Sequence, residues 1–157
     1  MPQSEVISLT VNGEQVTATV PVRRNLVDFL RNDLGLTGSH VGCEHGVCGA
    51  CTIDVDGAMI RGCLMLAVQA NGATVTTVEG LADSDRGADL RTAFEARNAL
   101  QCGYCTPGML ASALVYVEAG GAADKAAIRE HISGNYCRCT GYQAVVEAIC
   151  DVIEGAT

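Results

Sequence analysis

Four cysteines in the first half of the chain follow the spacing C-x4-C-x2-C-x11-C. This is the ligand spacing of a plant-type [2Fe–2S] site, in which each iron is bound by two thiolates. The segment with the first three cysteines also contains Gly46 and Gly49, which we expect to adopt positive φ so that backbone N–H groups approach the sulfurs. Such N–H groups stabilise an anionic cluster, and more strongly once it has gained an electron. The four predicted ligands are Cys43, Cys48, Cys51 and Cys63.

The second half contains two further cysteine pairs, C-x2-C and C-x-C, separated by 31 residues. Each pair is followed by Thr and then by an expected helix start, so two helix N-termini would meet at one centre and favour a net-negative group. The pairs alone leave a structural zinc site, a redox dithiol and a second [2Fe–2S] cluster open. The plant-type spacing in the same chain favours the second cluster. These predicted ligands are Cys102, Cys105, Cys137 and Cys139.

One cysteine and the three histidines have simpler interpretations. Cys150 lies on the apolar side of the predicted last helix, and we expect it to be a small buried hydrophobic residue. His45 lies within the first cysteine segment, but a Rieske-type site needs two histidine ligands, so we expect a loop residue. For His40 and His131 we expect surface or capping roles.

Composition excludes some classes of function. With 18 acidic and 10 basic residues the net charge is -8, which argues against nucleic-acid binding through phosphate neutralisation. No run approaches the ~20 apolar residues of a membrane-spanning helix. The first ten residues lack the apolar core of a signal peptide, so we expect a cytoplasmic location. Nine cysteines in such a chain are more typical of metal binding than of disulfides.

In the first half, alternating apolar residues and turn dipeptides predict a mixed sheet crossed by one helix. Asn12-Gly13 and Asp56-Gly57 are typical hairpin turns. Asn25 is a predicted helix N-cap, and Gly35 ends that helix. The predicted strands are 6–11, 15–20, 52–55, 58–61 and 73–78, an order that a β-grasp arrangement accommodates.

Beyond Leu81 the alternation stops and helical periodicity begins. Residues 82–87 form a predicted polar linker. Thr106 and Asp124 are predicted helix caps, and Gly120-Gly121 ends the helix that starts at Pro107. The predicted helices are 89–100, 107–116, 124–132 and 141–153, so the chain divides near residue 80.

Three motifs together resemble the small iron–sulfur subunit of the xanthine dehydrogenase family. They are C-x4-C-x2-C-x11-C, then Gln-Cys-Gly-Tyr-Cys-Thr-Pro-Gly at 101–108, and Cys-Arg-Cys-Thr-Gly-Tyr at 137–142. That family comprises molybdenum hydroxylases, among them aerobic carbon monoxide dehydrogenase and dehydrogenases of aldehydes and N-heterocycles. The resemblance covers nearly the whole chain, and all eight ligand positions match.

The resemblance implies an α+β fold: a plant-type ferredoxin β-grasp domain at 1–80, followed by a four-helix bundle at 81–157. It also implies two partners, a large subunit with the molybdopterin cofactor and a medium subunit with FAD. In the family the cluster of the helical half lies nearest the molybdenum cofactor, and the plant-type cluster lies towards the flavin. Gln101 matches a family glutamine beside the pterin, and Cys139 matches the cluster ligand closest to it.

The implied function is electron transfer within a multi-subunit oxidoreductase. Two [2Fe–2S] clusters in series would convert a two-electron oxidation at molybdenum into single steps towards FAD. Two alternatives stay open on the sequence alone. One is a binding or structural protein whose thiolates hold zinc, and the other is a freestanding two-cluster ferredoxin that serves diffusible partners.

Overall fold

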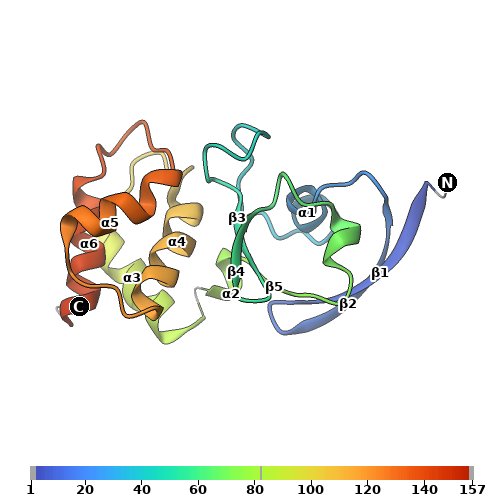
Figure 1. The fold of residues 1–157 in the computed structure, drawn as a ribbon, viewed down its shortest axis with the longest axis horizontal. Coiled ribbons are helices and arrows are strands. Elements are labelled where there is room, and N and C mark those ends of the chain that lie inside the picture. Colours follow the sequence, from blue (N-terminus) through green and yellow to red (C-terminus); the bar gives the residue numbers. More distant parts are fainter. Residues whose placement is uncertain (1–2, 82, 156–157) are drawn as a thin grey trace.

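The computed structural model describes residues 3–81 and 83–155, and its first half is built on a five-stranded mixed sheet. The strand order is β2-β1-β5-β3-β4, in which β1 pairs parallel with β5 and the other neighbouring pairs are antiparallel. The sheet occupies one side of the molecule, and the helices of the second half occupy the other (Figure 1). The strands are β1 Ser4–Val11, β2 Glu14–Pro21, β3 Thr52–Val55, β4 Ala58–Arg61 and β5 Thr74–Thr76.

Both hairpins form where their turn residues predict them. Asn12 and Gly13 have φ of 49° and 84°, and Asp56 and Gly57 have φ of 53° and 83°. Asn, Asp and Gly tolerate this left-handed conformation, which matches the twist of the flanking strands. The second hairpin matters for the site, because its two ends lead to Cys51 and Cys63.

The predicted helix after β2 is confirmed, and it contains two kinds of turn. The amide of Asp28 donates to the Asn25 side chain (2.8 Å) and caps α1, Leu26–Asp28. The chain continues as the π-helical turn η1, Phe29–Asp33, and Gly35 follows with φ of 73°. Leu26, Phe29 and Leu30 are fully buried against the sheet. This packing fixes the position of the crossing helix, and the first cysteine segment follows it in the chain.

The predicted strand at 73–78 extends beyond the end of β5, which lies at Thr76. The amide of Thr77 donates to the side chain of Asn12 (2.9 Å), whose Nδ2 donates to Thr77 Oγ1 (3.0 Å). This side-chain pairing takes the Thr77 backbone away from the sheet ladder. The chain then turns into α2, Val78–Leu81, and a 3-10 turn, η2 at Ala67–Ala70, precedes β5.

Helix α3 begins earlier than its apolar pattern predicts. The amide of Gly87 donates to Ser84 Oγ (3.1 Å), so the helix starts at Asp85 within the predicted linker and ends at Ala96, before Leu100. The linker prediction is therefore wrong for 85–87, and its residue 82 lies outside the described residues. The helices of the second half are α3 Asp85–Ala96, α4 Thr106–Glu118, α5 Lys125–His131 and α6 Gln143–Glu154, with the 3-10 turn η3 at Ile132–Gly134.

Two of the predicted caps have different outcomes. The amide of Ala127 donates to Asp124 (2.7 Å), which caps α5 as predicted. Thr106 is instead the first residue of α4, and Cys105 occupies the cap position without a side-chain hydrogen bond. Gly120 has φ of 73° just after α4, which explains the end of that helix.

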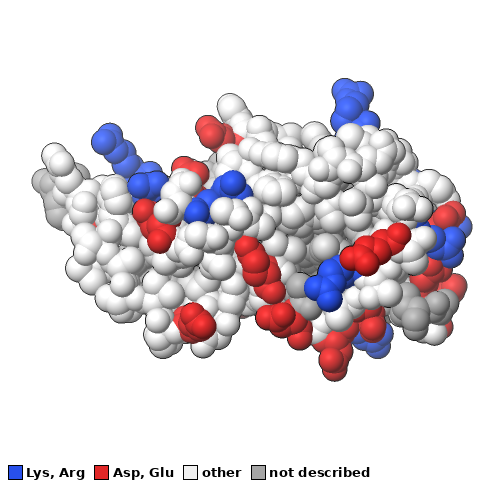
Figure 2. All heavy atoms as spheres, turned by 180° about the vertical axis from the view of Figure 1, so that it is seen from behind, with Lys and Arg blue, Asp and Glu red and all other residues white. Residues whose placement is uncertain are grey.

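Each half has its own hydrophobic core, and the two halves touch through α4, which packs on β3 and β4. The core of the second half lies among α3, α4, α5 and α6, with Phe94, Met109 and Ile149 fully buried. Within the described residues no helix is long and apolar enough to cross a membrane. Seen from behind, acidic and basic side chains are spread over the surface, with several acidic ones along the lower edge (Figure 2).

Candidate metal centres

The segment that holds Cys43, Cys48 and Cys51 has no regular secondary structure and rises between the two halves (Figure 1). Gly46 and Gly49 have φ of 75° and 77°, as expected. The amides of His45 and Cys48 both point at Cys43 Sγ, at 3.4 Å. Hydrogen bonds from the amides of Cys48 and His45 lower the pKa of the Cys43 thiol to about 6. The loop therefore stabilises a thiolate at this position.

Cys51 and Cys63 form the second thiol pair of this site, at the two ends of the β3–β4 hairpin. The amide of Gly62 donates to the Cys51 carbonyl (3.0 Å), which holds the hairpin ends together. Burial, with a smaller contribution from the neighbouring Cys63 thiol, raises the pKa of the Cys51 thiol to about 11. The charged form of Cys51 therefore needs a cationic partner, and iron is such a partner.

The second site also consists of two thiol pairs. The sulfurs of Cys102 and Cys139 lie 3.7 Å apart, and Cys105 and Cys137 lie within hydrogen-bonding reach of each other. Burial raises the pKa of Cys105 to about 12, with a further contribution from Cys137. For Cys137 the effect of burial is outweighed by hydrogen bonds from Thr140, so its pKa is lowered.

A threonine follows each cysteine pair of this set, and the two hydroxyl groups have different surroundings. Thr140 Oγ1 donates to Cys137 Sγ at 3.2 Å. Thr106 Oγ1, next to Cys105, is buried without a hydrogen-bond partner. Helix α4 begins directly after Cys105, so its N-terminus lies at the site, whereas α6 begins only at Gln143. One of the two expected helix N-termini is thus adjacent to a predicted ligand.

A hollow of about 210 Å³ connects the two cysteine sets. It contains all four thiols of the second set and also Cys48 of the first. Tyr104, Tyr136 and Arg138 form part of its wall. A polynuclear group held by the second set would therefore face a ligand of the first set.

The thiols of each cysteine set lie in two pairs. Within residues 3–81 and 83–155, no three His, Cys, Asp or Glu side chains converge on a point that could hold a single ion. Four separate thiol pairs, two in each set, match a cluster in which each iron takes two thiolates.

Tyr136, His40 and Tyr104 make contacts between the two cysteine segments that the sequence did not predict. The amide of Tyr136, next to Cys137, donates to the carbonyl of Cys48 (2.8 Å). His40 stacks on Tyr104 with ring centroids 4.5 Å apart, and Tyr104 OH donates to the Val41 carbonyl (2.7 Å). His40 is therefore a bridging residue and not only a surface residue. The only sequence signal for these contacts is proximity to cysteines.

The other residues with simple interpretations behave largely as expected. Cys150 is 7% exposed within the core of the helical half, and burial raises the pKa of its thiol. His45 is an exposed loop residue whose ring nitrogen bonds to the Cys43 carbonyl. His131 ends α5 and bonds to the Ser112 carbonyl (2.9 Å).

Gln101 and Cys139 lie together at the surface. Gln101 Nε2 donates to the Cys139 carbonyl (3.0 Å), and both residues are exposed. Leu100 and Cys102, the sequence neighbours of Gln101, are also exposed. So is Tyr136, which lines the hollow together with Cys139. The second cysteine set is thus open on the side where Gln101 lies.

Fold and thiol geometry together define an iron–sulfur protein, and two family models match it. A 2Fe-2S iron-sulfur cluster binding domain covers residues 9–74, and a [2Fe-2S] binding domain covers residues 77–150. The chain is 56% identical over 150 residues to the caffeine dehydrogenase subunit gamma of Pseudomonas sp. (strain CBB1), covering 93% of this chain and 89% of that relative. It is 52% identical over 145 residues to the nicotine 6-hydroxylase small subunit of Paenarthrobacter nicotinovorans, covering 92% and 87%.

A solved structure is similar to this chain in both fold and sequence. The chain matches the crystal structure of quinoline 2-oxidoreductase from Pseudomonas putida 86 with a TM-score of 0.90 and 48% identity, over 99% of this chain and 97% of that chain. The chain belongs to the family of small [2Fe–2S] subunits of the molybdenum hydroxylases. It is thus an electron-transfer subunit of a multi-subunit dehydrogenase, and substrate is oxidised on a partner subunit.

Proposed function

We propose that this chain carries single electrons from a molybdopterin site on a large subunit, through two [2Fe–2S] clusters, to FAD on a medium subunit. The first cluster is held by the plant-type set and the second by the helical set. Each cluster accepts and donates one electron at a time. The eight proposed ligands are Cys43, Cys48, Cys51 and Cys63, then Cys102, Cys105, Cys137 and Cys139.

The observation that carries this proposal is the contact between the two cysteine sets. Cys48 lines the same hollow as the four thiols of the helical set. The amide of Tyr136, the residue before Cys137 of the helical set, donates a hydrogen bond to the carbonyl of Cys48 in the plant-type set (2.8 Å). A zinc site or a redox dithiol would not require this proximity, but transfer between two one-electron centres does.

The chain's own residues tune and orient the two centres. Amides of His45 and Cys48 stabilise negative charge at Cys43 Sγ, and Thr140 Oγ1 does so at Cys137 Sγ. Hydrogen bonds of this kind raise a reduction potential because they favour the more negative, reduced state. Buried Cys51 lowers solvent access on the inner side of the first site.

The orientation of the relay between its two partners is part of the same proposal. We propose that the surface around Gln101 and Cys139 faces the pterin on the large subunit, supported by their mutual hydrogen bond and exposure. We propose that the plant-type loop faces the FAD-binding subunit. Leu64 (62% exposed) and Val47 (51% exposed) next to that loop support a contact surface there.

A cysteine variant in the helical set tests the relay. In Cys137→Ser we expect the loss of one reduced-cluster EPR signal, while the plant-type signal persists and transfer from substrate to flavin stops. Cys150→Ser is the matched control, because this thiol lies in the apolar core and outside both sets. Normal turnover in Cys137→Ser, with one cluster absent, would refute transfer in series.

Three finer features are part of the proposal. We propose a ferredoxin-like domain at 1–80 and a four-helix bundle at 81–157, supported by the two separate cores. We propose a cytoplasmic location, which suits nine cysteines that are not paired in disulfides. Fractionation of cells that carry the tagged chain tests the location.

We also propose that the complex oxidises a nitrogen heterocycle. The relatives at 56% and 52% identity are named for caffeine and nicotine, and the matching structure is named for quinoline. All three compounds contain ring nitrogen. Turnover of aldehydes but of no N-heterocycle by the purified complex would contradict this substrate class.

A further inference from the structure

A buried polar cluster joins the two halves directly beneath the cysteine segments. Asn135 is 2% exposed, and its Nδ2 donates to the Gly49 carbonyl (3.1 Å) and to Thr52 Oγ1 (3.4 Å). Its Oδ1 accepts from Ser112 Oγ (2.8 Å) on α4. A buried amide with all of these partners satisfied holds a single orientation.

Arg61 makes the second connection from the opposite direction. Its Nη2 donates to the Gly134 carbonyl (2.8 Å), and its Nη1 donates to Thr52 Oγ1. The Thr52 hydroxyl itself donates to the Gly49 carbonyl (2.7 Å). We call Arg61, Thr52, Asn135 and Ser112 the polar clamp.

Three of the four residues of the polar clamp lie within two positions of a predicted iron ligand. Thr52 follows Cys51, and Arg61 precedes Cys63 by two positions. Asn135 precedes Cys137 by two positions. A displacement within the clamp would therefore move ligands of both sets.

The backbones beneath the clamp are in close contact. A Cβ on Gly49, whose φ is 77°, would lie 2.5 Å from the Gly134 carbonyl oxygen. A Cβ on Gly108 would lie 2.1 Å from the Gly49 carbonyl oxygen. The two halves approach each other as closely as backbone permits, so the clamp leaves little freedom in their spacing.

The clamp also places a positive charge where the two halves meet, near Thr52 and Gly134. None of the ion pairs among the described residues involves Arg61, and its donors reach a carbonyl and a hydroxyl instead. An unneutralised guanidinium stabilises nearby anions, and more so after reduction.

We propose that Asn135 and Arg61 are positioning residues that fix the separation of the two cysteine sites and thereby the rate of electron transfer between them. The inference rests on the proposed two-cluster relay. Tertiary contacts that hold redox groups in place act on the transfer step without touching either metal.

The test measures magnetic interaction between the two reduced clusters in the full-length chain. Asn135→Leu removes every side-chain hydrogen bond of the amide without adding charge. We expect the EPR signals of both clusters to persist. The splitting of their lines, which arises from magnetic coupling between the two clusters, should narrow or disappear, and flavin reduction in the assembled complex should slow. Arg61→Met should narrow the splitting too and lower the midpoint potential of at least one cluster, and Arg61→Lys should restore the potential but not the splitting.

Ser84→Ala is the matched control, because it removes the cap of α3 without contacting either cysteine set. It should lower stability and leave the splitting unchanged. Wild-type splitting in Asn135→Leu with both clusters bound would overturn the inference, and if that variant does not assemble, wild-type splitting in Arg61→Met would overturn it. A wild-type chain without two clusters would instead refute the proposed function itself.

Discussion

At the scale of single residues, the thiols of Cys43 and Cys51 have opposite pKa shifts although both lie in one short segment. Amide hydrogen bonds lower the pKa of Cys43 to about 6, and burial raises that of Cys51 to about 11. Cys43 is therefore ready to bind iron as a thiolate, whereas Cys51 is shielded from solvent.

This contrast predicts selective alkylation of the iron-free chain. Neutral pH is above the pKa of Cys43, so this residue is mostly thiolate. It is far below the pKa of Cys51, about 11, and of Cys105, about 12, so these two residues are protonated. We expect iodoacetamide to modify Cys43 first, and the rate to fall as the pH is lowered through about 6. Peptide mass spectrometry over a time course measures this order. Equal rates for the three cysteines would contradict it.

At the scale of elements, the cysteine segment depends on the absence of a side chain at Gly49. Replacement by Ala combines a left-handed residue, which costs about 1–2 kcal/mol, with a clash against the next segment, which costs about 1–3 kcal/mol more. We expect Gly49→Ala to lower the free energy of unfolding by roughly 2–5 kcal/mol in urea denaturation followed by circular dichroism.

Gly57→Ala is the matched control for this prediction. Gly57 also has positive φ, at 83°, but a Cβ there would meet nothing within 4 Å. Its replacement should cost only the conformational part, about 1–2 kcal/mol. Equal losses in the two variants would show that the contact between segments contributes nothing.

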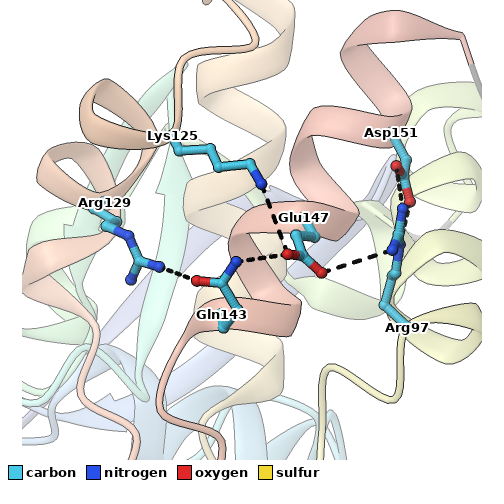
Figure 3. Close-up of polar contacts among 6 residues, drawn as sticks. All are labelled: Arg97, Lys125, Arg129, Gln143, Glu147 and Asp151. Carbon is cyan, nitrogen blue, oxygen red and sulfur yellow. Dashed lines mark hydrogen bonds and ion pairs between the residues drawn. The ribbon is translucent and has the colours of Figure 1, made fainter.

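Helices α3, α5 and α6 are joined on their outer side by a polar network (Figure 3). Arg97 donates two hydrogen bonds to Asp151 (2.6 and 2.8 Å), and Glu147 lies between Arg97 and Lys125 (3.6 and 3.7 Å). Gln143 connects Glu147 (2.5 Å) with Arg129. These side chains are partly exposed to solvent, so the network stabilises the helices only modestly.

The network predicts a small pH dependence of stability. The Arg97 hydrogen bond lowers the pKa of Asp151 below its ordinary value. A lowered folded-state pKa stabilises the fold above the ordinary pKa of Asp, and this contribution is lost as the pH falls through the lowered value. We expect Asp151→Asn to be less stable than wild type at neutral pH, with the difference vanishing in acid. Chemical denaturation at several pH values checks this, with exposed Glu118→Gln on α4 as control.

At the scale of the whole molecule, the two cores contain few of the predicted ligands. Of the eight, only Cys51 is buried, and the cores consist of apolar residues from the sheet and the helices. The cysteine segments lie outside them, in stretches without regular structure. Iron–sulfur bonds should therefore order these segments more than they hold the cores together.

Removal of iron with a chelator tests this division. We expect the visible absorption to disappear and the far-ultraviolet circular dichroism to change little, while the segment from Cys43 to Cys51 becomes sensitive to protease. The cores should survive because their apolar burial does not depend on metal. Collapse of the circular dichroism together with the visible bands would contradict this expectation.

Much of this protein follows from local sequence. The ligand spacing, the hairpin turns and the Asn25 cap act within a few residues, and for that reason the sheet and the first crossing helix could be predicted. The start of α3 was missed because the cap at Ser84 precedes the apolar pattern. The end of β5 was missed because Thr77 bonds to Asn12, which is distant in the sequence.

Tertiary structure alone decided how the two cysteine sets meet. Nothing near Asn135 or Arg61 in the sequence shows that they bond to the opposite half, because such contacts depend on the packing of α4 against β3 and β4. The types and spacing of the cysteines determined which chemistry the chain performs. Long-range packing determined the spacing of the two centres, because the distance between groups far apart in a chain is set by the fold that closes between them.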